Sequence, residues 1–145
     1  MRGTLGLLLA AAIAAACSSG HEKTDPPVVS VGGTYQTAVT LVRSSCPGQT
    51  VEQHSTVVNH VPGATALSLT HAGSTYNGSL AADGKFTTST VTQVFGGLSY
   101  QIGIAGRFSE TAIDALVTVA AGRQPPCTFS ARWAGPRSGA PNVMP

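Results

Sequence analysis

The chain has 145 residues, with 8 Lys and Arg against 6 Asp and Glu and a net charge of +2, a length typical of one domain. Charged residues make up 10% of the chain, whereas an average soluble domain has about 25%. The absence of any basic run excludes a nucleic acid held through its phosphates. Beyond residue 17 no apolar run approaches the length of about 18 residues that a membrane-spanning helix needs.

The first 17 residues have the layout of an export signal. Arg2 precedes an apolar run from Leu5 to Ala16 that is short for a membrane span and ends in small residues. The sequence Ala14-Ala15-Ala16-Cys17 resembles the lipobox of bacterial lipoproteins, with Ala14 where Leu is usual. The resemblance implies a signal peptide at residues 1–16 and a diacylglycerol on the Cys17 sulfur. The alternative is an ordinary secretory signal that leaves Cys17 free.

The number of cysteines agrees with a lipid on Cys17. An exported chain with 3 cysteines has one left over after a disulfide forms. Acylation of Cys17 removes the odd one and leaves Cys46 and Cys127 as the expected pair, in an oxidising compartment. The lipid would anchor the chain to a membrane, because each buried methylene contributes about 0.8 kcal/mol. Ser18 in place of Asp resembles the sorting pattern for the outer membrane, so the expected location is the outer membrane of the bacterial cell envelope, on its periplasmic or surface-facing side.

The rest of the chain divides into a tether, one β domain and a tail. Residues 17–28 are polar and proline-containing and are expected to form a flexible tether. Residues 29–136 are rich in Thr, Val, Ile and Tyr, which alternate with period two between regularly spaced turn residues. Residues 137–145 are expected to form a disordered tail. Strands are expected at residues 34–43, 50–61, 65–71, 75–80, 85–95, 98–108, 111–121 and 127–133.

These strands are expected to form an eight-stranded, antiparallel, up-and-down β-barrel. The short connections allow only neighbouring antiparallel pairs, and a closed sheet avoids two long exposed edges. Turns are expected at Ala72-Gly73 and Gly96-Gly97. The strongest hairpin signal is Asp83-Gly84, whose two residues are both expected to have positive φ, and Asn77-Gly78 is an alternative turn. In such a barrel the first and eighth strands are neighbours, which would bring Cys46 and Cys127 within disulfide range. The strand number and order resemble those of lipocalin and avidin barrels.

The alternation also predicts which side chains face the interior. The opposite strand faces are mostly Thr, Ser, Gln and small residues. All the aromatic residues except Phe95 belong to the inward set, which favours a filled interior over a ligand cavity. The expected inward residues are Tyr35, Val39, Leu41, Val51, Val57, Leu67, Leu69, Tyr76, Leu80, Phe86, Tyr100, Ile102, Ile104, Phe108, Ile113, Val117, Val119, Phe129 and Trp133.

No catalytic, metal or cofactor site is predicted. His54 and His60 lie about 20 Å apart on one expected strand, so they cannot share an ion. Together with His71 they are interpreted as surface histidines, and His21 as part of the solvated tether. No serine in a glycine-flanked turn is followed by a histidine, and no pair of carboxylates is placed for acid–base chemistry. The chain is therefore not expected to be an enzyme.

Two functions are compatible with this pattern. The first is a membrane-anchored lipoprotein with a structural or interaction role, which meets a protein partner through its Thr-rich surface or its loops. The alternative is a lipocalin-like carrier of a small apolar ligand, which an internal cavity of about 300 Å³ or more would favour. An integral outer-membrane barrel would need an apolar outer face and a polar interior, and the paired cysteines and the lipobox argue against it.

Overall fold

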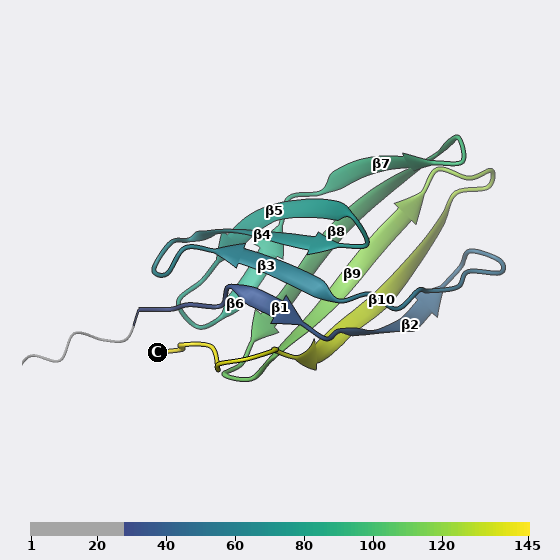
Figure 1. Ribbon diagram of the computed structural model, residues 1–145. Coiled ribbons are helices and arrows are strands. Elements are labelled where there is room, and N and C mark those ends of the chain that lie inside the picture. Colours follow the sequence, from purple (N-terminus) through teal and green to yellow (C-terminus); the bar gives the residue numbers. More distant parts are fainter. Residues whose placement is uncertain (1–27) are drawn as a thin grey trace, which may run out of the picture.

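The computed structural model describes residues 28–145 (Figure 1), so the expected signal peptide, Cys17 and nearly all of the tether lie outside the described residues. The described chain is all-β, with ten antiparallel strands in one sheet. No helix in this part of the chain is long and apolar enough to cross a membrane. The strands are β1 (Gly33–Tyr35), β2 (Ala38–Ser44), β3 (Thr56–His60), β4 (Ala66–His71), β5 (Ser74–Leu80), β6 (Lys85–Thr88), β7 (Val91–Phe95), β8 (Leu98–Phe108), β9 (Ala112–Ala121) and β10 (Cys127–Pro136).

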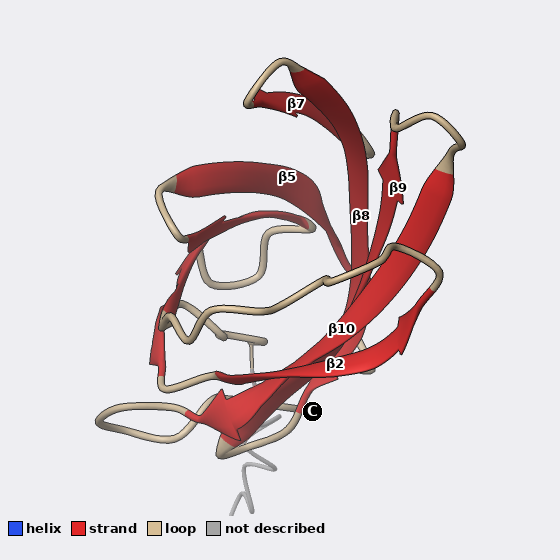
Figure 2. Ribbon diagram, turned by 90° about the vertical axis from the view of Figure 1, so that its right-hand side faces the viewer, coloured by secondary structure: helices blue, strands red, loops and turns tan. Residues whose placement is uncertain are grey.

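The sheet is an open half-barrel. Its strand order is β1-β3-β4-β5-β6-β8-β9-β10-β2, and β7 pairs with β8 outside this path. From β3 onward the chain follows the expected meander, because its short turns join neighbouring antiparallel strands. The sheet curls through 257° and does not close (Figure 2). The expectation of a closed eight-stranded barrel is therefore wrong in both strand number and closure.

The two additional strands arise because two expected strands are each interrupted partway along. The expected strand 34–43 breaks at Gln36 and Thr37, so that β1 pairs with β3 while β2 pairs with β10 at the other end of the sheet. The expected strand 85–95 is interrupted after Thr88. β6 and β7 both pair with β8, but only β6 also pairs with β5.

The half-barrel stays open because a loop, not a strand, follows β2. Of the expected strand 50–61, residues 56–60 pair as β3, and residues 45–55 form the loop. The side-chain amide of Gln53 donates to the Val39 carbonyl at 2.7 Å and accepts from the Val39 amide at 2.8 Å. One side chain thus satisfies backbone groups that a neighbouring strand would otherwise pair.

The loop also shifts the alternation of β3 by one residue. Val57, expected to face inward, is 38% exposed, whereas Val58 is 2% exposed. Leu41, Val51, Tyr100 and Phe129 are half-buried. The other expected inward residues are all buried: Tyr35, Val39, Leu67, Leu69, Tyr76, Leu80, Phe86, Ile102, Ile104, Phe108, Ile113, Val117, Val119 and Trp133.

The expected turns form, with one change of type. Ala72 and Gly73 both have positive φ, as do Gly96 and Gly97, which is the geometry of two-residue hairpins. At Asp83-Gly84, in contrast, only Gly84 has positive φ, and its amide donates to the Ala81 carbonyl at 3.0 Å. The Asp-Gly signal therefore marks the right place but a longer turn, since both of its residues were expected to have positive φ.

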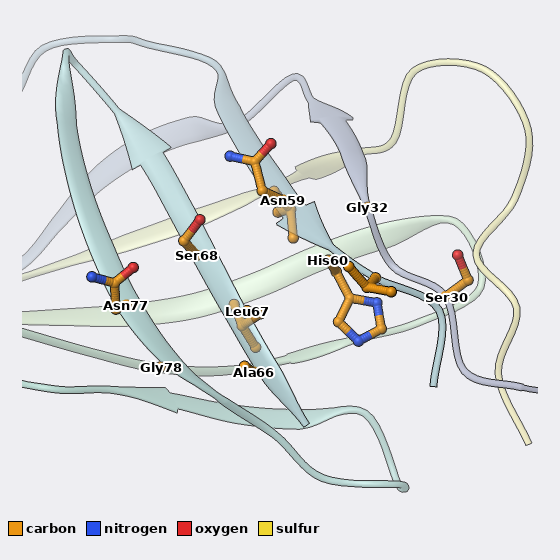
Figure 3. A pocket seen from close by; sticks show the side chains of 11 residues that line it. Ser30, Gly32, Asn59, His60, Ala66, Leu67, Ser68, Asn77 and Gly78 are labelled. Atoms are coloured by element: carbon orange, nitrogen blue, oxygen red, sulfur yellow. The ribbon is translucent and has the colours of Figure 1, made fainter. Parts of the chain in front are cut away.

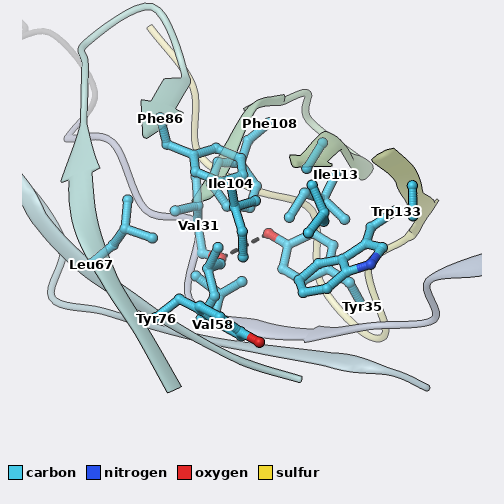
Figure 4. Packing of buried hydrophobic residues seen from close by; sticks show 14 of the residues in the cluster. Val31, Tyr35, Val58, Leu67, Tyr76, Phe86, Ile104, Phe108, Ile113 and Trp133 are labelled. Carbon is cyan, nitrogen blue, oxygen red and sulfur yellow. Dashed lines mark hydrogen bonds between the residues drawn. The ribbon is translucent and has the colours of Figure 1, made fainter. Parts of the chain in front are cut away.

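The interior is filled with side chains at the end of the half-barrel where β8 finishes. The ring centroids of Tyr35 and Phe108 lie 5.5 Å apart, and those of Phe86 and Phe108 lie 4.9 Å apart (Figure 4). The Tyr35 hydroxyl lies 2.7 Å from both the Val31 carbonyl and Asn142 Oδ1. The expectation of a filled interior holds for this end.

Residues 137–145, for which a disordered tail was expected, make defined contacts at the filled end. Asn142 is 5% exposed, and its Nδ2 donates to the Ser109 carbonyl at 2.7 Å. Val143 forms a β-bridge with Ser30, and Met144 packs against the hydrophobic core. These contacts join residues 137–145 to groups that lie far away in the sequence. The polar, non-alternating pattern of the segment does not indicate them.

Gly135 permits the close crossing at which the chain passes from β1 to β2. A Cβ at this position would lie 1.9 Å from the Gln36 carbonyl oxygen, which belongs to the backbone. We expect Gly135→Ala to lower the free energy of unfolding by about 2 kcal/mol, because overpacking forces the backbone to move. Urea unfolding measures the change.

The matched control is Gly103→Ala, on β8. A Cβ there meets only Thr90 Oγ1, at 3.7 Å, which is ordinary contact. This variant should unfold at the urea concentration of the parent or slightly above it. Equal midpoints for the two glycine variants would show that the crossing has room to spare.

The disulfide between Cys46 and Cys127 is confirmed. Their Cα atoms lie 5.1 Å apart. Cys46 follows β2 and Cys127 begins β10, and these two strands pair as the expected arrangement of the first and last strands required. The bond therefore ties the loop 45–55 to the sheet.

Candidate functional site

An open cavity of about 320 Å³ lies on the concave side of the sheet, away from the filled end. The β-sheet supplies its floor through side chains of β8, β9 and β10, and the loop after β2 and the β4–β5 turn supply its walls. The expectation of a filled interior therefore fails at this end. Among the residues that line the cavity, the ionisable or aromatic ones discussed below are Glu52, His54, His71, Tyr76, Phe95 and Trp133.

His71 and Trp133 form a stacked pair in this cavity. Their ring centroids lie 3.8 Å apart, and their planes differ by 15°. His71 ends β4, and Trp133 lies on β10, so it is the curl of the sheet that brings them together. Tyr76 meets Trp133 edge-on at 6.1 Å between centroids. The interpretation of His71 as a surface histidine is wrong, because it is 7% exposed.

A chain of hydroxyl groups fixes the tautomer of His71. Thr37 donates its single hydroxyl proton to the His54 carbonyl at 2.7 Å, and its oxygen lies 3.0 Å from that of Thr56. Thr56 must therefore donate to Thr37 and accept from Nδ1 of His71, which is 2.9 Å away. The proton of the neutral imidazole is on Nδ1, so Nε2 carries a lone pair.

The nitrogen that carries this lone pair is partly accessible at the cavity. His71 lines the cavity, and its Nε2 makes no hydrogen bond within residues 28–145. This nitrogen is also not fully buried, because among the described residues the fully buried side-chain nitrogen and oxygen atoms without a partner belong to Arg123 and Arg137. Nε2 of His71 is therefore a hydrogen-bond acceptor that a bound molecule could reach.

His71 is uncharged at neutral pH. Burial, and to a smaller extent the electrostatic effect of nearby His54, together lower its pKa to about 4. The two rings meet edge-on at 5.6 Å between centroids. His54 itself is on the rim of the cavity, where its Nε2 lies 3.3 Å from the Glu52 carboxylate. The cavity thus has an ionisable pair at its rim and a neutral acceptor inside.

His60, which was also interpreted as a surface histidine, is hydrogen-bonded to the backbone through both of its ring nitrogens. Its Nδ1 accepts from the Val31 amide at 3.4 Å, and its Nε2 lies 2.8 Å from the Ala64 carbonyl. It borders a wide hollow of about 800 Å³ on the outer face of β3, β4 and β5 (Figure 3). Asn59, Ser68 and Asn77 form a polar row across that face. Because these side chains diverge on a convex face, the concave cavity is the better candidate site.

Within residues 28–145 no three His, Cys, Asp or Glu side chains are placed to hold a metal ion.

The alternation of β4 carries a signal in the sequence for the position of His71 in the cavity. Leu67 and Leu69 were assigned to the interior, and the same alternation continued by two residues places His71 there as well. Likewise Thr37 follows Tyr35 with period two and is buried.

No family model, curated protein or solved structure matches the chain. The structure itself defines the class as an all-β half-barrel, stapled by one disulfide in its described part, with an aromatic cavity on its concave side.

Proposed function

We propose that this protein binds a small, flat, largely apolar molecule in the concave cavity. The observation that carries the proposal is the aromatic cavity beside an otherwise filled interior. Its volume of about 320 Å³ falls within the range of about 300–1,000 Å³ typical of small-molecule sites. Trp133, Tyr76 and Phe95 offer ring faces and edges to a flat partner. The role is that of a carrier or binding protein.

We further propose that a lipid on Cys17 holds this binding domain at a membrane of the bacterial cell envelope. The lipobox resemblance supports this anchor, and the tether 17–28 would give the domain reach. The measurement is the intact mass of the exported protein. A mass equal to that of the unmodified peptide would contradict the anchor without affecting the cavity.

Binding is tested with a chain that begins at Ser18, because all ten strands, the disulfide and both hydrophobic clusters lie within residues 28–145. The probe is N-phenyl-1-naphthylamine, a neutral dye that fluoresces in apolar surroundings. The chain has 1 Trp, so quenching of Trp133 emission reports dye bound to the domain, and the variants below locate it in the cavity. We expect saturable dye fluorescence with one site per chain and parallel quenching of Trp133.

Two variants on opposite faces of β9 make the test specific. Val119→Phe fills the cavity, which Val119 lines, whereas Leu116→Phe adds the same ring to the outer face, where Leu116 is 46% exposed. We expect Val119→Phe to abolish binding and Leu116→Phe to retain it, with circular dichroism confirming that both fold. Equal dye binding by both variants, or no saturable binding by the parent chain, would overturn the proposal.

An interaction role is the second candidate, and the tip of β7 favours it. β7 pairs with β8 and leaves its other edge unpaired, and Val94 and Phe95 are 67% and 56% exposed there. Exposed strand edges are able to pair with another chain. The dye experiment separates the two roles, because a partner strand on β7 does not need the volume that Val119→Phe removes.

A further inference from the structure

The cavity has a fixed acceptor but no fixed cation. The hydroxyl chain through Thr56 keeps the Nε2 lone pair of His71 available, as described above. The Tyr76 hydroxyl can rotate to donate or accept, so it does not discriminate between ligands. A ligand that lacks a donor would leave Nε2 without a hydrogen bond once water is expelled, and an unsatisfied buried acceptor is costly.

The distribution of charge disfavours a ligand with a carboxylate. No Lys or Arg is among the described residues that line the cavity. On β10, Arg132 points to the outer face and pairs with Asp114. The ionisable side chains that line the opening are Glu52 and His54, and Nε2 of His54 lies 3.3 Å from the Glu52 carboxylate. An anionic group would therefore enter a site with a carboxylate at its rim and no cation inside.

We propose that the ligand of this cavity is an uncharged, flat ring system that carries an N–H or O–H donor, and that this donor bonds to Nε2 of His71. Thr56 is then a positioning residue, because it holds the proton on the opposite nitrogen. The inference rests on the proposed binding function and adds the chemical class of the ligand.

Carbazole and fluorene test this class. The two molecules have nearly the same size and flat shape, but carbazole has a ring N–H where fluorene has a methylene group. Each competes with N-phenyl-1-naphthylamine for the chain that begins at Ser18. We expect carbazole to bind about tenfold more tightly than fluorene, the difference that one buried hydrogen bond makes.

Two variants assign the preference to His71. His71→Phe keeps a ring against Trp133 but removes the acceptor, so carbazole and fluorene should bind equally. Thr56→Val keeps the side-chain shape but frees the tautomer, so the preference should fall while fluorene binding stays within about twofold of the parent. A structural role of Thr56 alone would weaken both ligands together and leave their ratio unchanged.

The outcomes separate this inference from the function on which it rests. If the dye fails to bind saturably to the parent chain, the proposed function is wrong. If the parent chain binds both equally, the binding function stands and the donor requirement is wrong. A preference of the parent that persists unchanged in His71→Phe would also overturn the assignment to Nε2.

Discussion

Replacement of both Cys46 and Cys127 by alanine is expected to lower the free energy of unfolding by about 4.5 kcal/mol. The bond closes a loop with a sequence separation of 81 residues, and the chain-entropy model assigns that amount to a loop of this length. The open sheet makes the effect local as well, because the bond fixes the loop 45–55 that covers the free edge of β2. Urea unfolding of the oxidised parent and the double variant measures the difference.

Reduction of the disulfide provides the control. In the chain that begins at Ser18 no third thiol exists, so a reductant should lower the stability of the parent to that of the double variant. The double variant itself should not respond to the reductant. Equal stability of the oxidised parent and the double variant would show that the loop remains in place without the bond.

The second large effect is a loss of stability on acidification that depends on His71. Its pKa in the folded protein is about 4, against 6.5 for an unperturbed histidine. Between these two values the unfolded chain binds more protons than the folded chain, so stability rises with pH across this window. The contribution is complete above pH 6.5 and is lost as the pH falls toward 4. It amounts to about 3 kcal/mol.

The measurement is urea unfolding at several pH values between 4 and 7 for the parent and for His71→Phe. The difference between the two chains isolates His71, because the other titrating groups are common to both. Hydrogen bonds from Lys85 and Arg132 hold the pKa values of the Asp83 and Asp114 carboxyls below their ordinary values, and both residues are present in both chains. A pH dependence of the same size in His71→Phe would contradict the buried, neutral state of His71.

Much of the fold was predictable because alternation and turns are local properties. On β9 every second residue from Ile113 to Ala121 is buried, as its sequence pattern indicates. The turns at Ala72-Gly73 and Gly96-Gly97 form where they were expected, since these residues tolerate or favour positive φ. The disulfide followed from counting cysteines and strands. None of these inferences required knowledge of a distant contact, except that between the first and last strands.

The errors share a different physical origin, which is the choice of partner by each strand. The break at Gln36 depends on the Pro136 carbonyl, 100 residues away in the sequence, which accepts from the Gln36 amide. The shift of Val57 and Val58 depends on a loop whose Gln53 side chain occupies the edge of β2. In each case a locally strand-like segment gave way to a non-local contact.

The candidate site illustrates the same limit. Four residues from separate segments meet at this site. Thr37, Thr56 and His71 are joined by hydrogen bonds. The His71 ring stacks on Trp133. The alternation of β4 could have placed His71 inside, but not against Trp133, because their contact exists only in the curled sheet.

The β class, the turn positions and the inward face of most strands could be predicted from local patterns, because they follow from the two-residue pleat and from turn stereochemistry. The pairing of Cys46 with Cys127 followed from the number of cysteines and strands. The folded chain was needed to show that the sheet curls without closing, leaves a cavity at one end and holds residues 137–145 at the other. Those features depend on which distant backbone groups satisfy one another, and that choice is made only when the whole chain has come together.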